Sequence, residues 1–368
     1  MLRYHIDNVS YYSYYISRPY GQFVCSFFIR GQCDVFMHGG LGMNALVTGA
    51  TGFIGSVLVR ELHNQGHSVR ALALQNEDTT VLERLGIQIR RGDLTNPESL
   101  RGLCDGMDIV FHLAGRVTDW GRRELFYSAI LDATRNLLEE AAGKTARFVY
   151  ISSIAAIGFG RHLKGIRESD PAYKSGIPYN DAKLDAERLV MRFHDAGRTT
   201  CTIVRPANVT GPGSVWVRDI LDKMRSMPLP LIDQGRYSAS LIFVDNLTDG
   251  IVRAGTMDVA RGKTYHFRDD WDVTWKQYIT DIGSFIGKKP LGSVPYPVAR
   301  SVGTLCDMVF TPLGLRPPVT RMSVEITGRD NDVDTDLARH DLGWRTRVSY
   351  QEALQRIGVW VMERYLKP

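Results

Sequence analysis

From residue 43 to residue 205, short apolar runs alternate along the chain with stretches whose apolar residues recur at helical spacing. Because each run is short and largely apolar, the runs are typical of strands buried in a parallel sheet. Strands are expected at 44–48, 68–74, 87–90, 108–112, 146–151 and 200–204. Helices are expected at 53–64, 81–85, 124–142 and 179–196. The alternation predicts an α/β fold, a doubly wound parallel sheet with helices on both faces.

After Pro206 the alternation loosens, and prolines and glycines become frequent. This change predicts a smaller, loop-rich C-terminal lobe over 206–368, beside a sheet domain over 43–205. Two apolar runs, near 241–244 and 264–267, are expected to return to the sheet. No internal repeat is found.

Residues 1–42 differ in composition from the rest of the chain, because they hold ten of its 36 aromatic residues. They show neither strand nor helix periodicity and lack the pattern of a signal peptide. Met43 immediately precedes the first predicted strand, and the codons of Gly39 and Gly40 can contain a bacterial ribosome-binding sequence. We therefore expect 1–42 to be translated upstream sequence, with an aromatic-rich arm as the alternative.

Composition excludes several classes of protein. Hydrophobic residues make up 44% and charged residues 23% of the 368 residues, which are ordinary globular values. The net charge of +5 is small and no dense Lys/Arg block occurs, so no nucleic-acid partner is expected. The five cysteines form no CxxC pair and no Cys/His cluster, so we expect no metal site, no disulfide framework and a cytoplasmic location. No apolar run is long enough to predict a transmembrane helix.

A glycine-rich turn follows the first predicted strand and opens the first predicted helix. Gly49 permits the tight turn, Gly52 lets backbone N–H groups approach a pyrophosphate, and Gly55 lets the helix lie close to the sheet. The helix N-terminus favours the negative charge of the phosphates. The turn therefore predicts a Rossmann site for NAD or NADP, formed by Gly49, Thr51, Gly52, Phe53, Ile54 and Gly55.

The adenosine end of this site is less well defined by the sequence. The tip of the second predicted strand reads Ala73-Leu74-Gln75, with no carboxylate for the ribose hydroxyls of NAD and no arginine for the phosphate of NADP. Arg90 and Arg91, on the third predicted strand, are close enough in the sheet to reach it. The choice of cofactor stays open, with NAD favoured.

Three residues suggest hydride-transfer chemistry. Tyr179 and Lys183 are four residues apart and share one face of a predicted helix. A nearby ammonium favours the phenolate, so Lys183 is expected to lower the pKa of Tyr179 and also to bind the nicotinamide ribose. Ser153, at the end of the fifth predicted strand, can bind the substrate oxygen. We therefore expect Ser153, Tyr179 and Lys183 to be catalytic.

Together with the glycine turn, this constellation resembles the extended short-chain dehydrogenase/reductase family, the NAD-dependent epimerase/dehydratase superfamily. The resemblance covers 43–368, and its motifs include Gly92-Asp93-Leu94, His112 to Gly115, Phe148 to Gly158, Arg205 to Pro212, Phe243 to Asn246 and Asp341 to Trp344. It implies cofactor contacts from Asp93, Leu94, Leu113, Ala114, Gly115, Tyr179, Lys183 and Pro206. It also implies a homodimer that packs the helices of 124–142 and 179–196.

One position departs from the family pattern. Ile130 stands where the family usually has an asparagine that supports the lysine through water. The proton relay behind Lys183 is therefore an open question.

Two branches of the family compete for the substrate. Nucleotide-sugar enzymes usually carry an arginine where this chain has Ala239, and Arg236 is out of place, although Asn208 is a residue that sugar enzymes often keep. The other branch resembles 3β-hydroxysteroid dehydrogenases, through Val117 to Gly121 and the apolar segment 294–321. That segment can line an apolar pocket, contact a membrane surface or be a core helix. Trp120, Ser153 and Asn208 are the candidate substrate residues.

We therefore expect an NAD(P)-dependent oxidoreductase that interconverts a secondary alcohol and a ketone on a largely apolar small molecule, sterol-like or of the 3-oxoacyl type. A nucleotide-sugar epimerase or dehydratase is the alternative enzyme. A cofactor-sensing regulator is the alternative outside enzymes, and the retained Tyr179 and Lys183 argue against it.

Overall fold

The computed structural model describes residues 2–6, 9–13, 28–29 and 42–367. The chain forms two compact units, residues 1–41 and 42–368. In the first unit, β1 (Leu2–Ile6), β2 (Val9–Ser13) and β3 (Phe28–Ile29) form an antiparallel sheet in that order. The hypothesis of a translation start at Met43 concerns residues 1–42, most of which lie outside the described residues.

The second unit is built on a seven-stranded sheet with the order β14-β10-β8-β7-β4-β5-β6, in which every strand pair is parallel. The strands are β4 (Asn44–Thr48), β5 (Ser68–Ala73), β6 (Gln88–Arg91), β7 (Ile109–His112), β8 (Arg147–Ile151), β10 (Thr200–Pro206) and β14 (Thr264–Phe267). The central strand β7 is buried along its whole length, and β10 at every residue but the first, as both-sided helix cover requires. This sheet is the doubly wound Rossmann fold that the sequence predicts.

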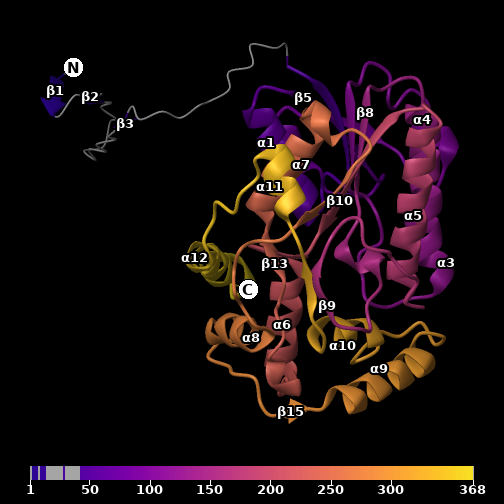
Figure 1. Cartoon of the computed structure of the whole chain (residues 1–368), viewed down its shortest axis with the longest axis vertical. Coiled ribbons are helices and arrows are strands. Elements are labelled where there is room, and N and C mark those ends of the chain that lie inside the picture. The colour runs from indigo at the N-terminus through magenta and orange to yellow at the C-terminus, as the bar shows by residue number, and fades with distance from the viewer. Residues whose placement is uncertain (1, 7–8, 14–27, 30–41, 368) are drawn as a thin grey trace. The chain divides into compact units, whose positions relative to one another are not determined.

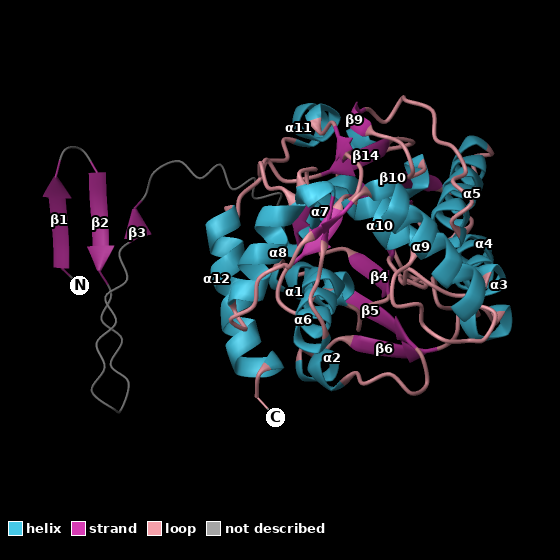
Figure 2. Cartoon of the chain, turned by 90° about the horizontal axis from the view of Figure 1, so that it is seen from below, coloured by secondary structure: helices cyan, strands magenta, loops and turns pink. Residues whose placement is uncertain are grey.

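Helices cover both faces of the sheet (Figure 1). One layer holds α3 (Arg123–Phe126), α4 (Ala133–Ala141) and α5 (Pro178–Asp195), which stay together in both Figure 1 and Figure 2. The other face carries α1 (Phe53–Asn64), α7 (Val244–Thr256) and α11 (Asp336–Leu342), while α2 (Thr80–Arg84) links β5 to β6. The helix predicted over 124–142 is interrupted, because Tyr127–Asp132 forms a π-helical turn between α3 and α4.

The C-terminal lobe gathers at one end of the sheet. It contains α6 (Val215–Ser226), α8 (Trp275–Ser284), α9 (Tyr296–Phe310), α10 (Arg321–Thr327) and α12 (Tyr350–Trp360). Three pairs of short strands join its loops: β11 (Asn208–Thr210) with β13 (Leu241–Phe243), β12 (Leu231–Ile232) with β15 (Ser293–Val294), and β16 (Asn331–Val333) with β9 (Leu163–Ile166). None of the helices in the described ranges is both long and apolar enough to cross a membrane.

The expectation for the run 241–244 is wrong. This run does not return to the main sheet, because β14 occupies the free edge of β10. The chain leaves that edge at Pro206, continues as β11, and β13 pairs with β11 in a separate two-stranded sheet. The run 264–267 forms β14 and lies in the main sheet. One hydrophobic cluster extends from Ala45 in β4 to Val361, so 43–205 and 206–368 share a core.

Candidate active site

The carboxyl ends of β4, β7, β8 and β10 lie at one edge of the sheet, because the strands are parallel. The glycine turn follows β4, Gly115 lies beyond β7, Ser153 lies beyond β8, and Pro206 ends β10. In doubly wound sheets this edge is where ligands bind. The topology therefore gathers residues that are more than 100 positions apart in the chain.

The glycine turn is shaped for close approach. Gly49 has φ +68°, and a Cβ there would lie 2.9 Å from the backbone N of Ala114. A Cβ on Gly55 would lie 2.0 Å from the carbonyl oxygen of Gly49. Gly52 is the N-cap of α1, and no side chain caps this helix or adds an acid to its first turn. The first N–H groups of α1 are thus free for an anion such as a pyrophosphate.

An open cavity of about 550 Å³ lies at the tips of β5 and β6, where the adenosine is expected. Its lining residues are Leu74, Gln75, Asn76, Glu77, Arg91, Gly92, Asp93 and Ser99. The Arg91 guanidinium donates to the carbonyls of Leu74 and Glu77 and to the Thr79 hydroxyl. The Glu77 carboxylate accepts from the N–H of Leu74. Arg91 is thus committed to this loop, and the carboxylate beside it fits the ribose hydroxyls of NAD.

A buried polar chain supports the turn from below. His112, at the end of β7, contacts the hydroxyl of Thr48 at 2.8 Å and that of Thr134 at 3.0 Å. Burial lowers the pKa of His112 to about 3, so the imidazole is neutral at pH 7. Thr48 also accepts from the N–H of Ala114. These hydrogen bonds therefore hold the loop of Leu113, Ala114 and Gly115 against the glycine turn.

The structure brings the three candidate catalytic residues together from α5 and from the turn after β8. Tyr179 lies in the first turn of α5 after Pro178, and its side chain is 7% exposed. The Lys183 Nζ, one turn later, donates to the carbonyl of Ile151 at the end of β8, at 2.7 Å. Ser153 caps the short 3₁₀ turn Ile154–Ile157, where its hydroxyl accepts from the N–H of Ala155. A phenol, an amine and a hydroxyl thus converge on one edge of the sheet.

The charges of this trio differ from the expectation. Burial raises the pKa of Tyr179 to about 12, and the hydrogen bond with Ser153 only opposes this rise. Burial also lowers the pKa of Lys183 to about 8, against the attraction of Glu187. The predicted depression of the Tyr179 pKa by Lys183 is therefore wrong for this structure, since burial is the largest influence on this phenol and Lys183 is not among the groups that shift its pKa. The phenol of Tyr179 is therefore protonated at pH 7.

The sequence profile of the NAD dependent epimerase/dehydratase family matches residues 45–267. The chain belongs to this family. Among its relatives is the 4-hydroxy-2-methyl-3-oxo-4-farnesyl-3,4-dihydroquinoline-1-oxide ketoreductase of Stigmatella aurantiaca, which is 30% identical over 86% of this chain and 96% of the relative. Another is a 3 beta-hydroxysteroid dehydrogenase/Delta 5-->4-isomerase of Mycobacterium tuberculosis, 29% identical over 89% of this chain and 92% of the relative.

A solved structure shows the same fold. UDP-glucose 4-epimerase from Thermotoga maritima, determined with UDP-glucose, has a TM-score of 0.71 and covers 88% of this chain and 100% of its own. At 20% identity this likeness concerns the fold alone. The chain is an enzyme of the extended short-chain dehydrogenase/reductase family, and NAD is the cofactor of this epimerase/dehydratase family.

The position that departs from the family pattern lies inside the π-helical turn. Ile130 is 1% exposed, and a Cβ on Gly115 would lie 3.6 Å from its Cγ1 and 4.0 Å from the Lys183 Nζ. Its carbonyl accepts from the hydroxyl of Thr134. An apolar side chain thus fills the space beside the lysine, and the carbonyl of Ile151 supplies the polar contact instead.

The remaining predicted site residues lie in several settings. Asp93 is exposed at the cavity and accepts from Thr95, whereas Leu94 is a core residue. The Phe53 ring lies against Gly211, and Asn208 donates its amide to the carbonyl of Ala239. The position at which nucleotide-sugar members carry an arginine is thus a buried alanine whose carbonyl is occupied. Thr51 and Ile54 flank Gly52 in the glycine turn, and Trp120 lies half-buried in the loop after β7.

Sequence reasoning missed a buried ion pair behind the lysine. Glu187, one turn after Lys183, accepts two hydrogen bonds from Arg205, and both side chains are almost fully buried. Arg205 also contacts His266 of β14. A glutamate four residues after the lysine is a visible signal, because i and i+4 share a helix face. Arg116, directly after Gly115, was also missed.

Proposed function

We propose that this enzyme reduces a ketone to a secondary alcohol on a largely apolar small molecule. The observation that carries the proposal is the buried trio, in which a neutral Tyr179 lies with Ser153 and a lysine held by the carbonyl of Ile151. Two family relatives support the choice of substrate by their names, one a ketoreductase whose name includes a farnesyl group and one a steroid dehydrogenase.

Each residue has a distinct task. NAD(P)H, when bound, supplies the hydride to the carbonyl carbon. Ser153 donates a hydrogen bond to the carbonyl oxygen and orients it. Tyr179 gives its phenolic proton to the same oxygen, which a phenol with a pKa of about 12 can do because it is protonated at neutral pH. Lys183, as an ammonium, binds the ribose and stabilises the phenolate that this transfer leaves.

Purified protein tests this proposal with matched substrates. Apolar ketones, from sterol-like to 3-oxoacyl compounds, are offered with NADH and then NADPH, and the loss of the reduced-nicotinamide absorbance is followed. Turnover that Tyr179→Phe abolishes supports the proposal and identifies the nicotinamide. No net oxidation of the cofactor, with a nucleotide sugar converted in the product analysis, would contradict it.

We also propose that the enzyme is a cytoplasmic homodimer that packs α4 and α5 of each copy together. The support for the compartment is that Cys104, Cys201 and Cys306 are free thiols. The support for the dimer is that α4 and α5 lie side by side and expose charges of both signs, which suits a self-complementary interface. Light scattering of the purified protein gives the mass, and a monomer that stays active would contradict this assembly.

We further propose that the outer face of α9 rests on an anionic lipid surface. Only Tyr296, Ala299 and Gly303 of this helix are buried. Eight of the 20 large hydrophobic side chains exposed in the described part of the chain lie between residues 298 and 319: Val298, Val302, Leu305, Met308, Val309, Leu313, Leu315 and Val319. Of the three interpretations of this segment, the core helix accounts only for Tyr296 and Ala299, because the apolar stripe faces outward. An outward apolar face of this kind marks a contact with another surface.

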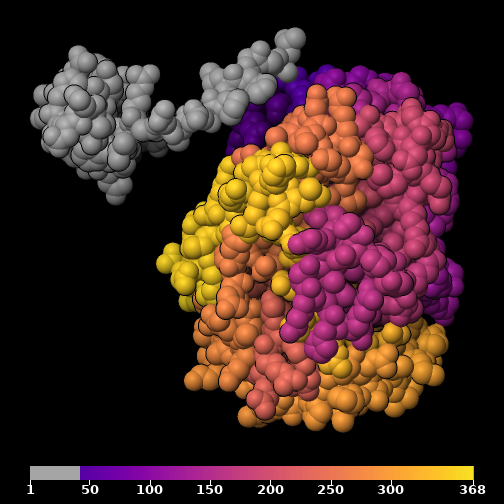
Figure 3. Space-filling view, in the orientation of Figure 1, coloured from indigo at the N-terminus to yellow at the C-terminus, as the bar shows by residue number. Residues whose placement is uncertain are grey.

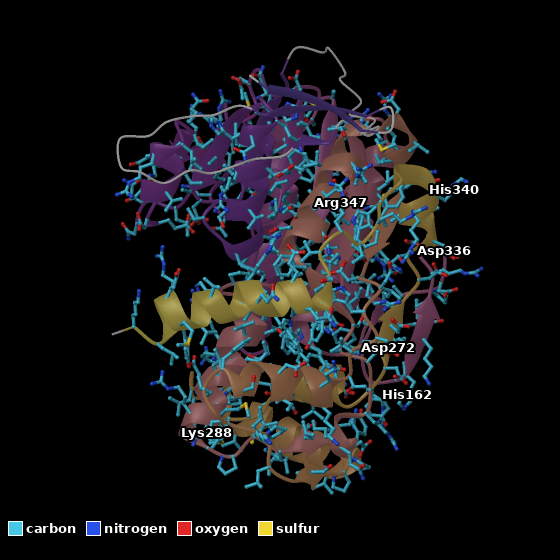
Figure 4. All side chains as sticks on the ribbon, turned by 90° about the vertical axis from the view of Figure 1, so that its left-hand side faces the viewer. His162, Asp272, Lys288, Asp336, His340 and Arg347 are labelled. Atoms are coloured by element: carbon cyan, nitrogen blue, oxygen red, sulfur yellow. The ribbon has the colours of Figure 1, made fainter. Side chains whose placement is uncertain are left out.

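The charges around α9 favour lipid over a protein groove. Between residues 287 and 319 every exposed charged side chain is basic: Lys288, Lys289, Arg300 and Arg316. Lys288 lies at the lower end of the molecule in Figure 4, the same end at which α9 forms the lower margin in Figures 1 and 3. An apolar helix face with basic neighbours is the arrangement that binds the headgroups and upper acyl chains of an anionic membrane.

Sedimentation with vesicles tests this contact. We expect binding to vesicles that contain phosphatidylglycerol, weaker binding to pure phosphatidylcholine, and loss of binding in Leu305→Gln with Met308→Gln. Val81→Gln with Val359→Gln removes two exposed apolar side chains elsewhere and is the matched control. Vesicle binding that is unchanged in Leu305→Gln with Met308→Gln would contradict the proposal. A change of oligomeric mass without vesicle binding would also contradict it.

A further inference from the structure

A cation at the reacting end of the site has no partner. Within the described residues, no hydrogen bond and no ion pair engages the guanidinium of Arg116, and its Nε is fully buried. Leaving a charged donor desolvated without an acceptor is costly. In a folded protein such a group is commonly satisfied by something the chain does not itself supply.

The surroundings of Arg116 hold it in one place. Its guanidinium carbon lies 5.5 Å from the centroid of the Phe126 ring, and Phe126 is 2% exposed. A Cβ on Gly121, which has φ +135°, would lie 3.1 Å from the Nη2 of Arg116. The glycine and the ring thus form two sides of a slot for the guanidinium. Asp119, an acid of the same loop, is bound instead by Thr320 and Arg316.

Arg116 belongs to the reacting end of the site rather than the adenosine end. It directly follows Gly115, which lies beside the Lys183 Nζ. The Phe126 ring that carries the guanidinium also contacts the Tyr179 ring edge-on, with centroids 6.3 Å apart. The glycine turn, by contrast, would hold the phosphates of a bound dinucleotide, and the cavity at Asp93 would hold its adenosine.

We propose that Arg116 binds a carboxylate that the substrate carries near the reacting carbonyl. The inference rests on the proposed function and narrows it to amphiphilic oxo acids, with an apolar body and an anionic head. A guanidinium suits this task because its parallel N–H groups match the two oxygens of a carboxylate. The carboxylate takes no part in the chemistry and leaves the reaction unchanged. Its role is to orient the carbonyl toward Tyr179.

Pairs of substrates test this subsite in the full-length enzyme. A long-chain 3-oxo acid and its methyl ester differ in the charge and by one methyl group, and kcat/KM is measured for both with wild type, Arg116→Gln and Arg116→Lys. We expect Arg116→Gln to lose about 10- to 100-fold on the acid and to leave the ester within about twofold. Arg116→Lys should recover part of the loss. Arg84→Gln removes an exposed arginine of α2 and should change neither.

Equilibrium binding keeps the proposal testable without turnover. Calorimetry with dodecanoate should show binding to wild type and a loss of about 10-fold or more in Arg116→Gln. The dissociation constants of NADH and NADPH, from nicotinamide fluorescence, should stay the same. An equal loss on acid and ester would overturn the proposal, and weaker cofactor binding in Arg116→Gln would assign Arg116 to a cofactor phosphate. Reduction of both the acid and the ester that is unchanged in Arg116→Gln leaves the reductase intact but removes the subsite, whereas reduction of neither substrate contradicts the reductase itself.

Discussion

Helices α5 and α9 both reverse the usual pattern of a surface helix, in opposite directions. α5 buries 11 of its 18 residues, and four of these, Asn180, Asp181, Lys183 and Glu187, are polar or charged. α9 buries three of its 15 residues and turns a stripe of valine, leucine and methionine outward. Buried polar groups need partners, and Asp181, Lys183 and Glu187 find theirs in a loop and in neighbouring strands. Exposed apolar groups need a covering surface, which nothing in the described unit provides for α9.

The difference teaches where function departs from the rules that stabilise a fold. In α5 the burial of charged side chains costs folding free energy. It serves function because electrostatic interactions with the reacting groups are stronger in a site without water. In α9 the exposed apolar surface is the basis of the proposed contact with a lipid surface. Both departures are visible only when the pattern of each helix is compared with its surroundings.

The largest expected effect comes from removing the proton donor of α5. Tyr179→Phe deletes the phenolic hydroxyl and keeps the ring against Phe126. We expect kcat for ketone reduction to fall by about 10²- to 10⁴-fold, the usual contribution of a general acid. The melting temperature and the dissociation constant of NADH should not change. Retained activity would show that another group donates the proton.

Breaking the ion pair behind Lys183 tests the buried charges of α5. Arg205→Met leaves Glu187 buried without its cation, which should cost about 3–5 kcal/mol in the free energy of unfolding. Urea denaturation followed by fluorescence measures this loss. Arg135→Met removes one side of an exposed pair with Asp132 and should leave the midpoint unchanged. Equal losses in the free energy of unfolding for the two variants would contradict the burial of the Glu187–Arg205 pair.

Leucines on the two helices allow a direct comparison. Leu189→Ala, on the buried face of α5, should lower the free energy of unfolding by about 2–5 kcal/mol, because it opens a cavity. Leu305→Ala, on the outer face of α9, should change it by less than about 0.5 kcal/mol. Denaturation curves of both variants check this. A large loss in Leu305→Ala would mean that the α9 face packs on the chain itself.

The pH dependence of reduction reports on Lys183. The active form is the ammonium, which dominates below its pKa of about 8 and is lost as the pH rises through that value. The rate of ketone reduction should therefore be level near pH 7 and fall above about pH 8. Lys183→Arg keeps the charge to higher pH and should remove the fall. A rate that rises above about pH 8 would contradict this assignment.

The smallest expected effect concerns residues 1–42. Because 42–368 forms a compact unit by itself, a chain that begins at Met43 should keep the same melting temperature and the same kcat. Calorimetry and steady-state assays of the two chains make this comparison. A lower melting temperature of the shorter chain would favour the interpretation of residues 1–42 as an aromatic-rich arm over that of translated upstream sequence.

The local order of elements was predictable from the sequence, and several features of the site were not. The runs from Asn44 to Val204 predicted every strand of that half that lies in the main sheet, since period and length are local properties, but not the short strand β9. Leu241–Phe243 was placed in the wrong sheet because the edge that it was expected to join is taken by β14, a strand from later in the chain. The π-helical turn at Ile130 also escaped prediction, because its spacing of apolar residues is close to that of an α-helix.

The sequence by itself determined the glycine turn, the spacing of Tyr179 and Lys183, and the serine at a strand end, because each depends on chemistry within a few residues. Only the tertiary structure decided that Tyr179 is a neutral phenol, that Ile151 holds the lysine, that Arg116 lacks a partner and that the stripe of α9 faces outward. Burial and ion pairing depend on which distant segments meet. The sequence gives the identity of each residue, whereas the charge and the exposure of its side chain depend on its neighbours in space.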